Sequence, residues 1–164
     1  MQSYNDLNID YQGGDLEVYK MNLNSLSYSP QHITGNFDCD FNELCSLVGG
    51  PLKVDGNYNC YYNKLTDLVG CASHIGKTLR CSNNEITSLV GIHKIIKSCN
   101  EIKFNPYDIK YGGIGLLLID NLRYMPNNSS QFNIIAKYLG EGTKGMMECS
   151  KELKAKGYDN YAKL

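Results

Sequence analysis

The segments Tyr58-Asn-Cys60-Tyr-Tyr-Asn63-Lys-Leu65 and Leu79-Arg-Cys81-Ser-Asn-Asn84-Glu-Ile86 carry the same order of residue types, 21 positions apart. A third copy precedes them, and the period extends over the rest of each unit. The columns that keep it are Cys39, Cys60 and Cys81; Asn42, Asn63 and Asn84; Leu44, Leu65 and Ile86; Leu47, Leu68 and Leu89; Gly49, Gly70 and Gly91; and Val54, Ile75 and Ile96. Because spacing and residue type agree over three consecutive units, they predict a solenoid that repeats one structural unit per coil.

The register extends beyond these three units in both directions. Upstream, the apolar columns continue at Leu16, Val18, Leu23, Leu26 and Ile33. Downstream, Ile102 falls on the cysteine column and Asn105 on the asparagine column, before Pro106 interrupts the pattern. Terminal repeats cap a solenoid rather than stack in it. We therefore expect one compact unit with an N-terminal cap at 1–15, a solenoid of 21-residue coils at 16–107 and a C-terminal cap at 108–164.

The unit apolar-x-Cys-x-x-Asn-x-Leu-x-x-Leu resembles the leucine-rich-repeat signature L-x-L-x-x-N-x-L in a cysteine-substituted form. The resemblance implies an α/β repeat fold, a short leucine-rich-repeat solenoid with a parallel β-sheet on its concave face. Alternation along a strand places Tyr58 and Cys60 inside. The following asparagine turns the chain, and its amide is expected to form a ladder between coils. A 21-residue coil leaves little room for a helix on the return side, so we expect extended or 3₁₀ segments there.

The C-terminal part predicts two helices. Ser130 is expected to cap the first, which presents an apolar stripe and ends at Gly140. Thr143 is expected to cap the second, which carries late lysines and ends at Gly157. An open solenoid end exposes apolar side chains and strand edges, so we expect these helices to form a lid over the last coil.

The same region, GGIGLLLIDNL followed by IIAKYLGEGTKGMMECSKELKAKGYDNYAKL, resembles the C-terminal part of small repeat proteins of large tailed bacteriophages. Those proteins carry similar Cys/Asn repeats ahead of it, so the resemblance covers nearly the whole chain. It implies a phage origin and expression in the cytoplasm of a bacterial host. It implies no activity, and no functional residue is carried over from it.

Composition narrows the classes of partner. The chain has 16 basic and 17 acidic residues, a net charge of −1, which disfavours nucleic acid and anionic membranes. The N-terminal MQSYNDLNIDYQ does not look like a secretory signal, and the longest apolar run, Ile114 to Ile119, is too short to span a bilayer. We therefore expect a cytoplasmic protein in which the seven cysteines are reduced.

The candidate catalytic and metal-binding groups do not converge on a site. Neighbouring strands lie about 4.8 Å apart, so a column of cysteines cannot close around one zinc ion. His32 and His74 stand two coils apart, and surface histidines are the simpler interpretation. Cys71 and His74 lack an orienting acid of the kind a nucleophile triad needs. We expect no catalytic residue, no metal and no cofactor.

A glycine-rich segment precedes the expected helices. Gly112, Gly113 and Gly115 could suggest a phosphate loop, but the G-K-[ST] ending is missing, so a turn is the preferred interpretation.

The register also predicts which side chains face outward from the sheet. The first outward column is Glu17, Asp38, Asn59, Arg80 and Glu101; the second is Tyr19, Asp40, Tyr61, Ser82 and Lys103; the column at the lip is Lys20, Phe41, Tyr62, Asn83 and Phe104. Exposed aromatic residues with an arginine among them have the composition of an interface hot spot. The alternative is that Phe41, Tyr62 and Phe104 fold back and stack on one another.

These observations favour a non-enzymatic protein–protein interaction module. The resemblance to phage repeat proteins implies that it binds a bacterial host protein in host takeover or counter-defence. The candidate partner-binding residues are Tyr19, Asp38, Asp40, Phe41, Asn59, Tyr61, Tyr62, Arg80, Lys103 and Phe104. The acidic residues of this face disfavour nucleic acid as the partner. Two other functions stay open: a virion or assembly protein that self-associates as a homo-oligomer, and a nucleotide-trapping protein with a pocket near Gly112–Gly115 and Lys144.

Overall fold

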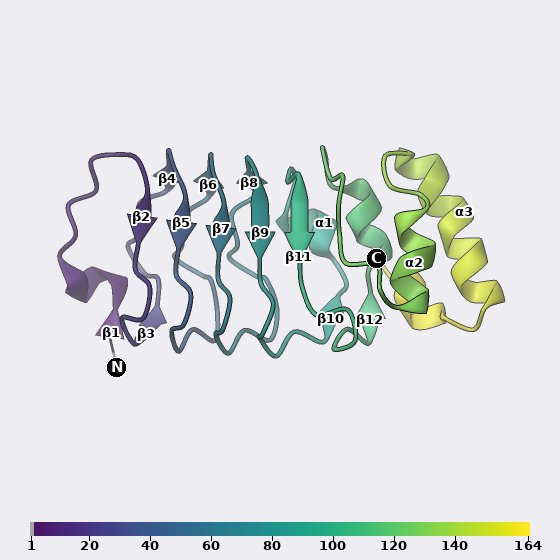
Figure 1. Ribbon diagram of the computed structural model, residues 1–164, viewed down its shortest axis with the longest axis horizontal. Helices are drawn as coiled ribbons and strands as arrows, with labels where there is room; N and C mark the ends of the chain where they lie inside the picture. Colours follow the sequence, from purple (N-terminus) through teal and green to yellow (C-terminus); the bar gives the residue numbers. More distant parts are fainter. Residues whose placement is uncertain (1) are drawn as a thin grey trace.

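The computed structural model describes residues 2–164 and shows a solenoid of parallel strands, with helices gathered at its C-terminal end (Figure 1). The main sheet has five strands in the order β11-β9-β7-β5-β2. Their bounds are β2 Leu16–Glu17, β5 Phe37–Asp38, β7 Tyr58–Asn59, β9 Thr78–Arg80 and β11 Glu101–Lys103. Because neighbouring strands belong to consecutive coils, each outward row of side chains contains one residue per coil.

The return side of the coils is also extended. A second parallel sheet has the order β4-β6-β8, with bounds His32–Ile33, Lys53–Val54 and His74–Ile75. Two smaller parallel pairs lie along a third side: β1 Gln2–Ser3 with β3 Leu23–Ser25, and β10 Ser88–Leu89 with β12 Tyr111–Gly112. The expectation of extended return segments is confirmed for the coils that carry the second sheet.

The cysteine column faces the interior, as predicted. Cys39, Cys60 and Cys81 are at most 2% exposed, and each thiol donates to a backbone carbonyl of the next coil at 3.2 to 3.4 Å. Burial raises the pKa of the Cys39 and Cys60 thiols well above the usual value, and that of Cys81 to about 12. All seven cysteines are free thiols. The buried ones therefore pack as small apolar side chains with a weak donor.

The predicted asparagine ladder is also confirmed. The Asn42 Oδ1 accepts from the backbone N–H groups of Met21 and Leu23, and its Nδ2 donates to the carbonyls of Val18 and Cys39. Asn63 and Asn84 make equivalent bonds one and two coils further on, although each Oδ1 accepts from a single backbone N–H group, that of Leu44 or Leu65. Each amide thus joins its own turn to the preceding coil.

The period changes after Cys81. Phe37 pairs with Tyr58 and Tyr58 with Leu79, both 21 residues apart, but Leu79 pairs with Ile102, which is 23 residues away. A short helix, α1 Ile92–Ile95, lies in this longer coil. Ile102 therefore does not continue the cysteine column and Asn105 does not continue the asparagine ladder, which corrects both predictions.

The parallel pairing extends past residue 107. β12 pairs with β10, and isolated bridges join Ser98 to Asp120 and Glu101 to Tyr124. The segment expected to begin the C-terminal cap at 108 therefore first completes a further coil. It includes the 3₁₀ helix η2 Ile114–Leu118, whose residues are almost all buried.

Beyond that coil lie α2 Ser130–Ala136, α3 Gly142–Ala155 and the 3₁₀ helix η3 Asp159–Ala162. The N-cap of α2 is Ser129, whose hydroxyl accepts from the Phe132 N–H at 3.4 Å, and not Ser130. α3 begins at Gly142 after Glu141, without a side-chain cap, so Thr143 is not the capping residue. No helix within residues 2–164 has the length and apolar character needed to cross a bilayer.

The N-terminal segment closes the other end. β1 pairs with β3, and the 3₁₀ helix η1 Tyr4–Leu7 follows, with Tyr4 only 4% exposed. The Ser3 N–H donates to the Asp6 carboxylate at 2.8 Å. Met1, the first residue of the expected N-terminal cap, lies outside the described residues.

Candidate protein-binding face

The outer face of the main sheet carries the predicted candidate residues except Phe104, with one change of register. Strand pairing aligns one residue from each of the five strands in a row that we call the central row: Glu17, Asp38, Asn59, Arg80 and Lys103. The 21-residue period had placed Glu101 at its end and Lys103 in the next row. Because the coil between β9 and β11 is two residues longer, Lys103 stands beside Arg80.

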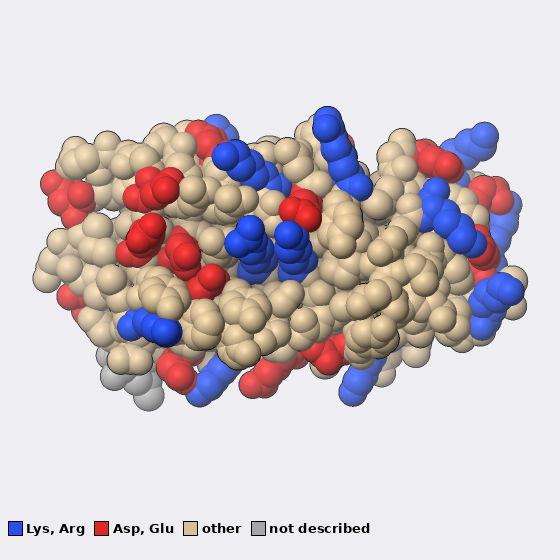
Figure 2. Space-filling view, in the orientation of Figure 1, with Lys and Arg blue, Asp and Glu red and all other residues tan. Residues whose placement is uncertain are grey.

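The central row separates charge along the solenoid. Figure 2 shows acidic side chains gathered over β2 and β5 and basic side chains over β9 and β11. The Lys103 Nζ lies 3.3 Å from the Glu101 carboxylate. The face therefore has an acidic half and a basic half, although the net charge of the chain is only −1.

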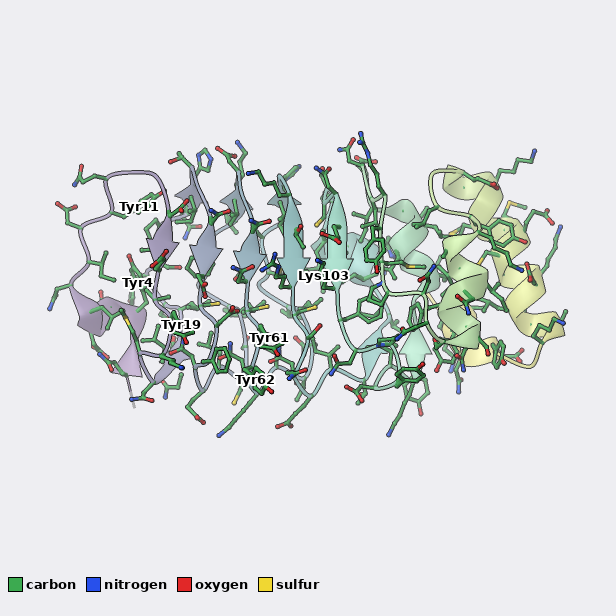
Figure 3. The ribbon with its side chains drawn as sticks, in the orientation of Figure 1. Tyr4, Tyr11, Tyr19, Tyr61, Tyr62 and Lys103 are labelled. Atoms are coloured by element: carbon green, nitrogen blue, oxygen red, sulfur yellow. The ribbon has the colours of Figure 1, made fainter. Side chains whose placement is uncertain are left out.

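An aromatic cluster lies where the strands of the main sheet end, and we call it the aromatic band: Tyr19, Phe41, Tyr61 and Tyr62. Phe41 stacks on Tyr62 with ring centroids 4.7 Å apart, and Tyr19 and Tyr61 meet Phe41 edge-on at 5.6 Å. Figure 3 shows Tyr19, Tyr61 and Tyr62 together at this edge, with Lys103 higher on the sheet. Tyr19, Phe41 and Tyr62 remain 44%, 38% and 46% exposed, so stacking does not remove them from the surface.

The backbone at the band adopts a conformation that aromatic residues rarely take. Lys20, Phe41, Tyr62 and Asn83 occupy the same place in consecutive coils, with φ between 51° and 54°. Asparagine tolerates this left-handed region, whereas other residues with a Cβ pay a steric penalty there. The Lys20 Nζ also lies 5.0 Å and 5.1 Å from the Tyr19 and Phe41 ring centroids. Lys20 therefore belongs to this face, as Glu17 does through the central row. The outward columns predicted from the 21-residue period contained both residues.

Phe104 does not belong to the exposed surface, contrary to the prediction. The longer coil moves it into line with the cysteine column, because the Cys81 thiol donates to the Lys103 carbonyl as the Cys60 thiol donates to that of Arg80. Phe104 is 4% exposed and meets Phe132 of α2 with ring centroids 5.0 Å apart. It is a core residue that directly follows β11 and packs against α2.

Asp40 is the most perturbed carboxyl group of the face. Partial burial, together with the nearby charge of Asp38, raises its pKa to about 6, although a hydrogen bond from the Tyr61 N–H and the charge of Arg80 oppose the shift. That hydrogen bond to Oδ1 is 2.6 Å long. The face therefore changes charge within a mildly acidic pH range.

Asp40→Asn tests this assignment through stability. A carboxyl group whose pKa is raised on folding stabilises the protein below its unfolded pKa of 3.8, and this contribution is lost as the pH rises through about 6. We expect the variant, which keeps an oxygen for the Tyr61 N–H, to be more stable than wild type at pH 7.5 by ~1 kcal/mol after allowance for solvent screening, and equally stable at pH 3.5. Urea unfolding at both pH values measures the difference.

Asp55→Asn is the matched control of opposite sign. Hydrogen bonds from Lys53 and His32 lower the pKa of Asp55. Its contribution is present above the unfolded pKa and lost as the pH falls, so this variant should be less stable than wild type at pH 7.5. A stabilised Asp55→Asn, or an Asp40→Asn with no dependence on pH, would contradict the assignment.

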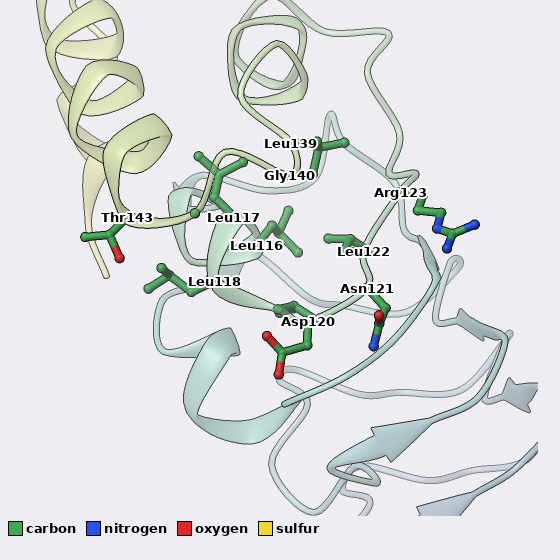
Figure 4. A pocket seen from close by; sticks show the side chains of 12 residues that line it. Leu116, Leu117, Leu118, Asp120, Asn121, Leu122, Arg123, Leu139, Gly140 and Thr143 are labelled. Atoms are coloured by element: carbon green, nitrogen blue, oxygen red, sulfur yellow. The ribbon is translucent and has the colours of Figure 1, made fainter.

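A hollow lies between the last coil and the start of α3 (Figure 4). Its volume is about 460 Å³, and it is lined by Leu116–Arg123, Leu139, Gly140, Gly142 and Thr143. The predicted pocket lay between the last coil and the helices, as this hollow does, but neither Gly112–Gly115 nor Lys144 is among the residues that line it. A Cβ on Gly113 would lie 3.0 Å from Phe132 and Ile135, because that glycine is packed against α2.

The residues considered for a metal site or a nucleophile, His32, His74 and Cys71, make contacts within the fold or are buried in it. His32 pairs with Asp55 at 2.9 Å, and the His74 Nδ1 contacts the Ser73 hydroxyl at 2.9 Å. Burial raises the pKa of the Cys71 thiol well above its usual value, which disfavours the thiolate that a nucleophile requires. Within residues 2–164, no three histidine, cysteine or acidic side chains are grouped closely enough to hold a metal ion.

Comparison of the chain with protein-family models, with curated proteins and with solved structures finds no match. The geometry of the face therefore carries the functional argument.

Proposed function

We propose that this chain is a non-enzymatic protein-interaction module of the leucine-rich-repeat type, which binds a protein partner through the central row and the aromatic band. The exposed, mutually stacked aromatic residues carry this proposal. Tyrosine is enriched in interface hot spots because its ring contributes a large contact area with little loss of side-chain entropy. The left-handed backbone at Phe41 and Tyr62 adds support, because strained conformations of this kind cluster at functional sites.

The class of partner follows from charge and from the phage resemblance. Glu17, Asp38 and Asp40 would repel a phosphate backbone from half of the face, so a protein is favoured over nucleic acid. The resemblance to phage repeat proteins suggests a bacterial host protein in the cytoplasm, bound in host takeover or counter-defence. In this proposal α2 and α3 act as the helical cap of the repeat.

Capture from bacterial lysate by the tagged chain tests the proposal. Wild type should enrich a host protein that Tyr61→Ala/Tyr62→Ala loses by at least about tenfold, because removing a hot-spot side chain typically weakens binding by 2 kcal/mol or more. The purified host protein should then bind wild type directly, measured by calorimetry.

The matched control is Tyr28→Ala/Tyr107→Ala. These tyrosines are 82% and 73% exposed and lie outside the face, and Tyr28 also has a positive φ of 68°. This control should capture the host protein as wild type does. Equal capture by the Tyr61→Ala/Tyr62→Ala variant would remove the aromatic band from the interface.

A further inference from the structure

The central row is self-complementary in charge about its middle residue. Read from β2 to β11, it is acidic, acidic, neutral, basic and basic: Glu17, Asp38, Asn59, Arg80 and Lys103. The residues are evenly spaced, one per strand, at roughly 4.8 Å. Asp38 and Arg80, which have opposite charges, therefore lie equally far from Asn59 on β7, and so do Glu17 and Lys103.

We infer that a second copy of this chain docks on the outer face of the main sheet, about a two-fold axis that runs along β7. This inference rests on the proposed function, because it names a partner for the same face. The axis reverses the order of strands between the copies. It brings Asp38 opposite Arg80 of the second copy, Glu17 opposite Lys103, and Asn59 opposite Asn59.

The aromatic band supports the same axis. Tyr61 and Tyr62 lie two and three residues beyond the end of β7, so the axis brings them beside their own counterparts in the second copy. Tyr62 is 46% exposed and Tyr61 is half-buried. Isologous interfaces of closed dimers place one patch against itself in this way, and hot spots gather near their centre.

Charge rejects the two-fold axis perpendicular to β7, which would also stack the two faces. An axis along the stack of coils would place Asp38 against Asp38 and Arg80 against Arg80. Like charges in contact weaken association and exclude that arrangement. The charge order of the row therefore fits a second copy as the partner and favours the axis along β7 over the perpendicular one.

A neighbouring row limits the strength of the dimer. It is formed by Asp15, Asn36, Asn57, Thr78 and Glu101, and the proposed axis brings the two acids opposite each other. Both carboxylates already accept hydrogen bonds within the chain, from the Asn36 N–H at 2.7 Å and the Thr78 hydroxyl at 2.8 Å. Five short strands also make a small interface, so we expect a dissociation constant of about 10–100 μM.

Sedimentation equilibrium of the full chain tests the inference. Wild type should approach twice its mass of 18.4 kDa as concentration rises, and added salt should weaken the association. Asp38→Arg and Arg80→Asp should each raise the dissociation constant at least tenfold, because each creates two repelling contacts per dimer. Glu17→Lys, at an exposed residue, repeats the test without changing a hydrogen-bonded side chain.

The two charge reversals combined in one chain provide the decisive test. The double variant Asp38→Arg/Arg80→Asp should dimerise nearly as wild type does, because the opposite charges face each other again. An equimolar mixture of the two single variants should also form heterodimers. Glu85→Arg and Lys94→Asp reverse exposed charges outside the face and should leave the dissociation constant unchanged.

Two results would overturn the inference. One is a wild-type chain that stays monomeric up to about 1 mM; the other is a dimer that the single reversals leave intact. In the first case, loss of host-protein capture by Tyr61→Ala/Tyr62→Ala would still support the proposed function. Conversely, a charge-dependent dimer that captures no host protein would support self-association and contradict host binding.

Discussion

Gly70→Ala should lower the free energy of unfolding by about 3–5 kcal/mol, the largest stability effect that we expect from a single methyl group in this protein. Gly70 has a φ of +87°, and a Cβ there would lie 2.3 Å from the Val48 amide nitrogen and 2.5 Å from the Leu47 carbonyl carbon. Both atoms belong to the backbone of the preceding coil. The added methyl group would therefore push two coils apart as well as strain its own backbone.

Gly91→Ala separates these two contributions. Gly91 occupies the equivalent place one coil later with a φ of +78°, but nothing lies within 4 Å of the Cβ that it would carry. Only the left-handed strain applies, so a loss of about 1–2 kcal/mol is expected. Tyr28 occupies the same place in the coil that precedes Gly49, and its side chain is exposed. A side chain that points into solvent is therefore tolerated at this place in a coil.

Urea unfolding of the two variants measures the difference. Similar losses for Gly70→Ala and Gly91→Ala would show that backbone strain alone explains the glycine column, and that close approach of the coils does not.

Asn63→Ala should cost about 2–4 kcal/mol, because it leaves buried backbone groups without partners. The Asn63 Oδ1 accepts from the Leu44 N–H at 3.0 Å, and its Nδ2 donates to the Cys39 and Cys60 carbonyls at 3.0 and 3.3 Å. Asn63 is 8% exposed, so water cannot readily replace these bonds. The variant should also lower cooperativity, since the lost bonds join two coils.

Asn105→Ala is the control, because the 21-residue period and the observed strand pairing place Asn105 differently. The 21-residue period places Asn105 on the asparagine column, but its amide makes only a 3.5 Å contact with the Asn83 side chain. We expect less than about 0.5 kcal/mol for this surface change. Thermal and urea unfolding should separate the two variants clearly, and a loss at Asn105 equal to that at Asn63 would contradict the register of β11.

Much of the candidate face could be predicted from sequence because its residues follow the repeat. Tyr19, Asp40, Tyr61 and Tyr62 lie where the period placed them, since each coil up to β9 has the same length and pairs with its neighbours in the same register. Phe104 could not be placed correctly. Its burial depends on how many residues the coil around α1 accommodates, and that number is set by packing rather than by a local signal.

The ends of the solenoid were also harder to predict. A Ser-Ser pair offers two adjacent N-caps for α2, and only the hydrogen bond from Phe132 identifies Ser129. The further coil at residues 108–124 has no Cys/Asn motif, and it is recognised by its bridges to Ser98 and Glu101.

The 21-residue pattern is sufficient to predict the parallel solenoid, the buried cysteine column, the asparagine ladder and the existence of an aromatic outer face. These features repeat every 21 residues and depend on contacts between adjacent coils, so a local pattern is enough to specify them. The positions of Lys103 in the central row and of Phe104 in the core follow instead from the packing of the folded chain. Both depend on the two extra residues of one coil, and shifting a strand by two residues keeps its inward and outward alternation while changing every neighbour it meets.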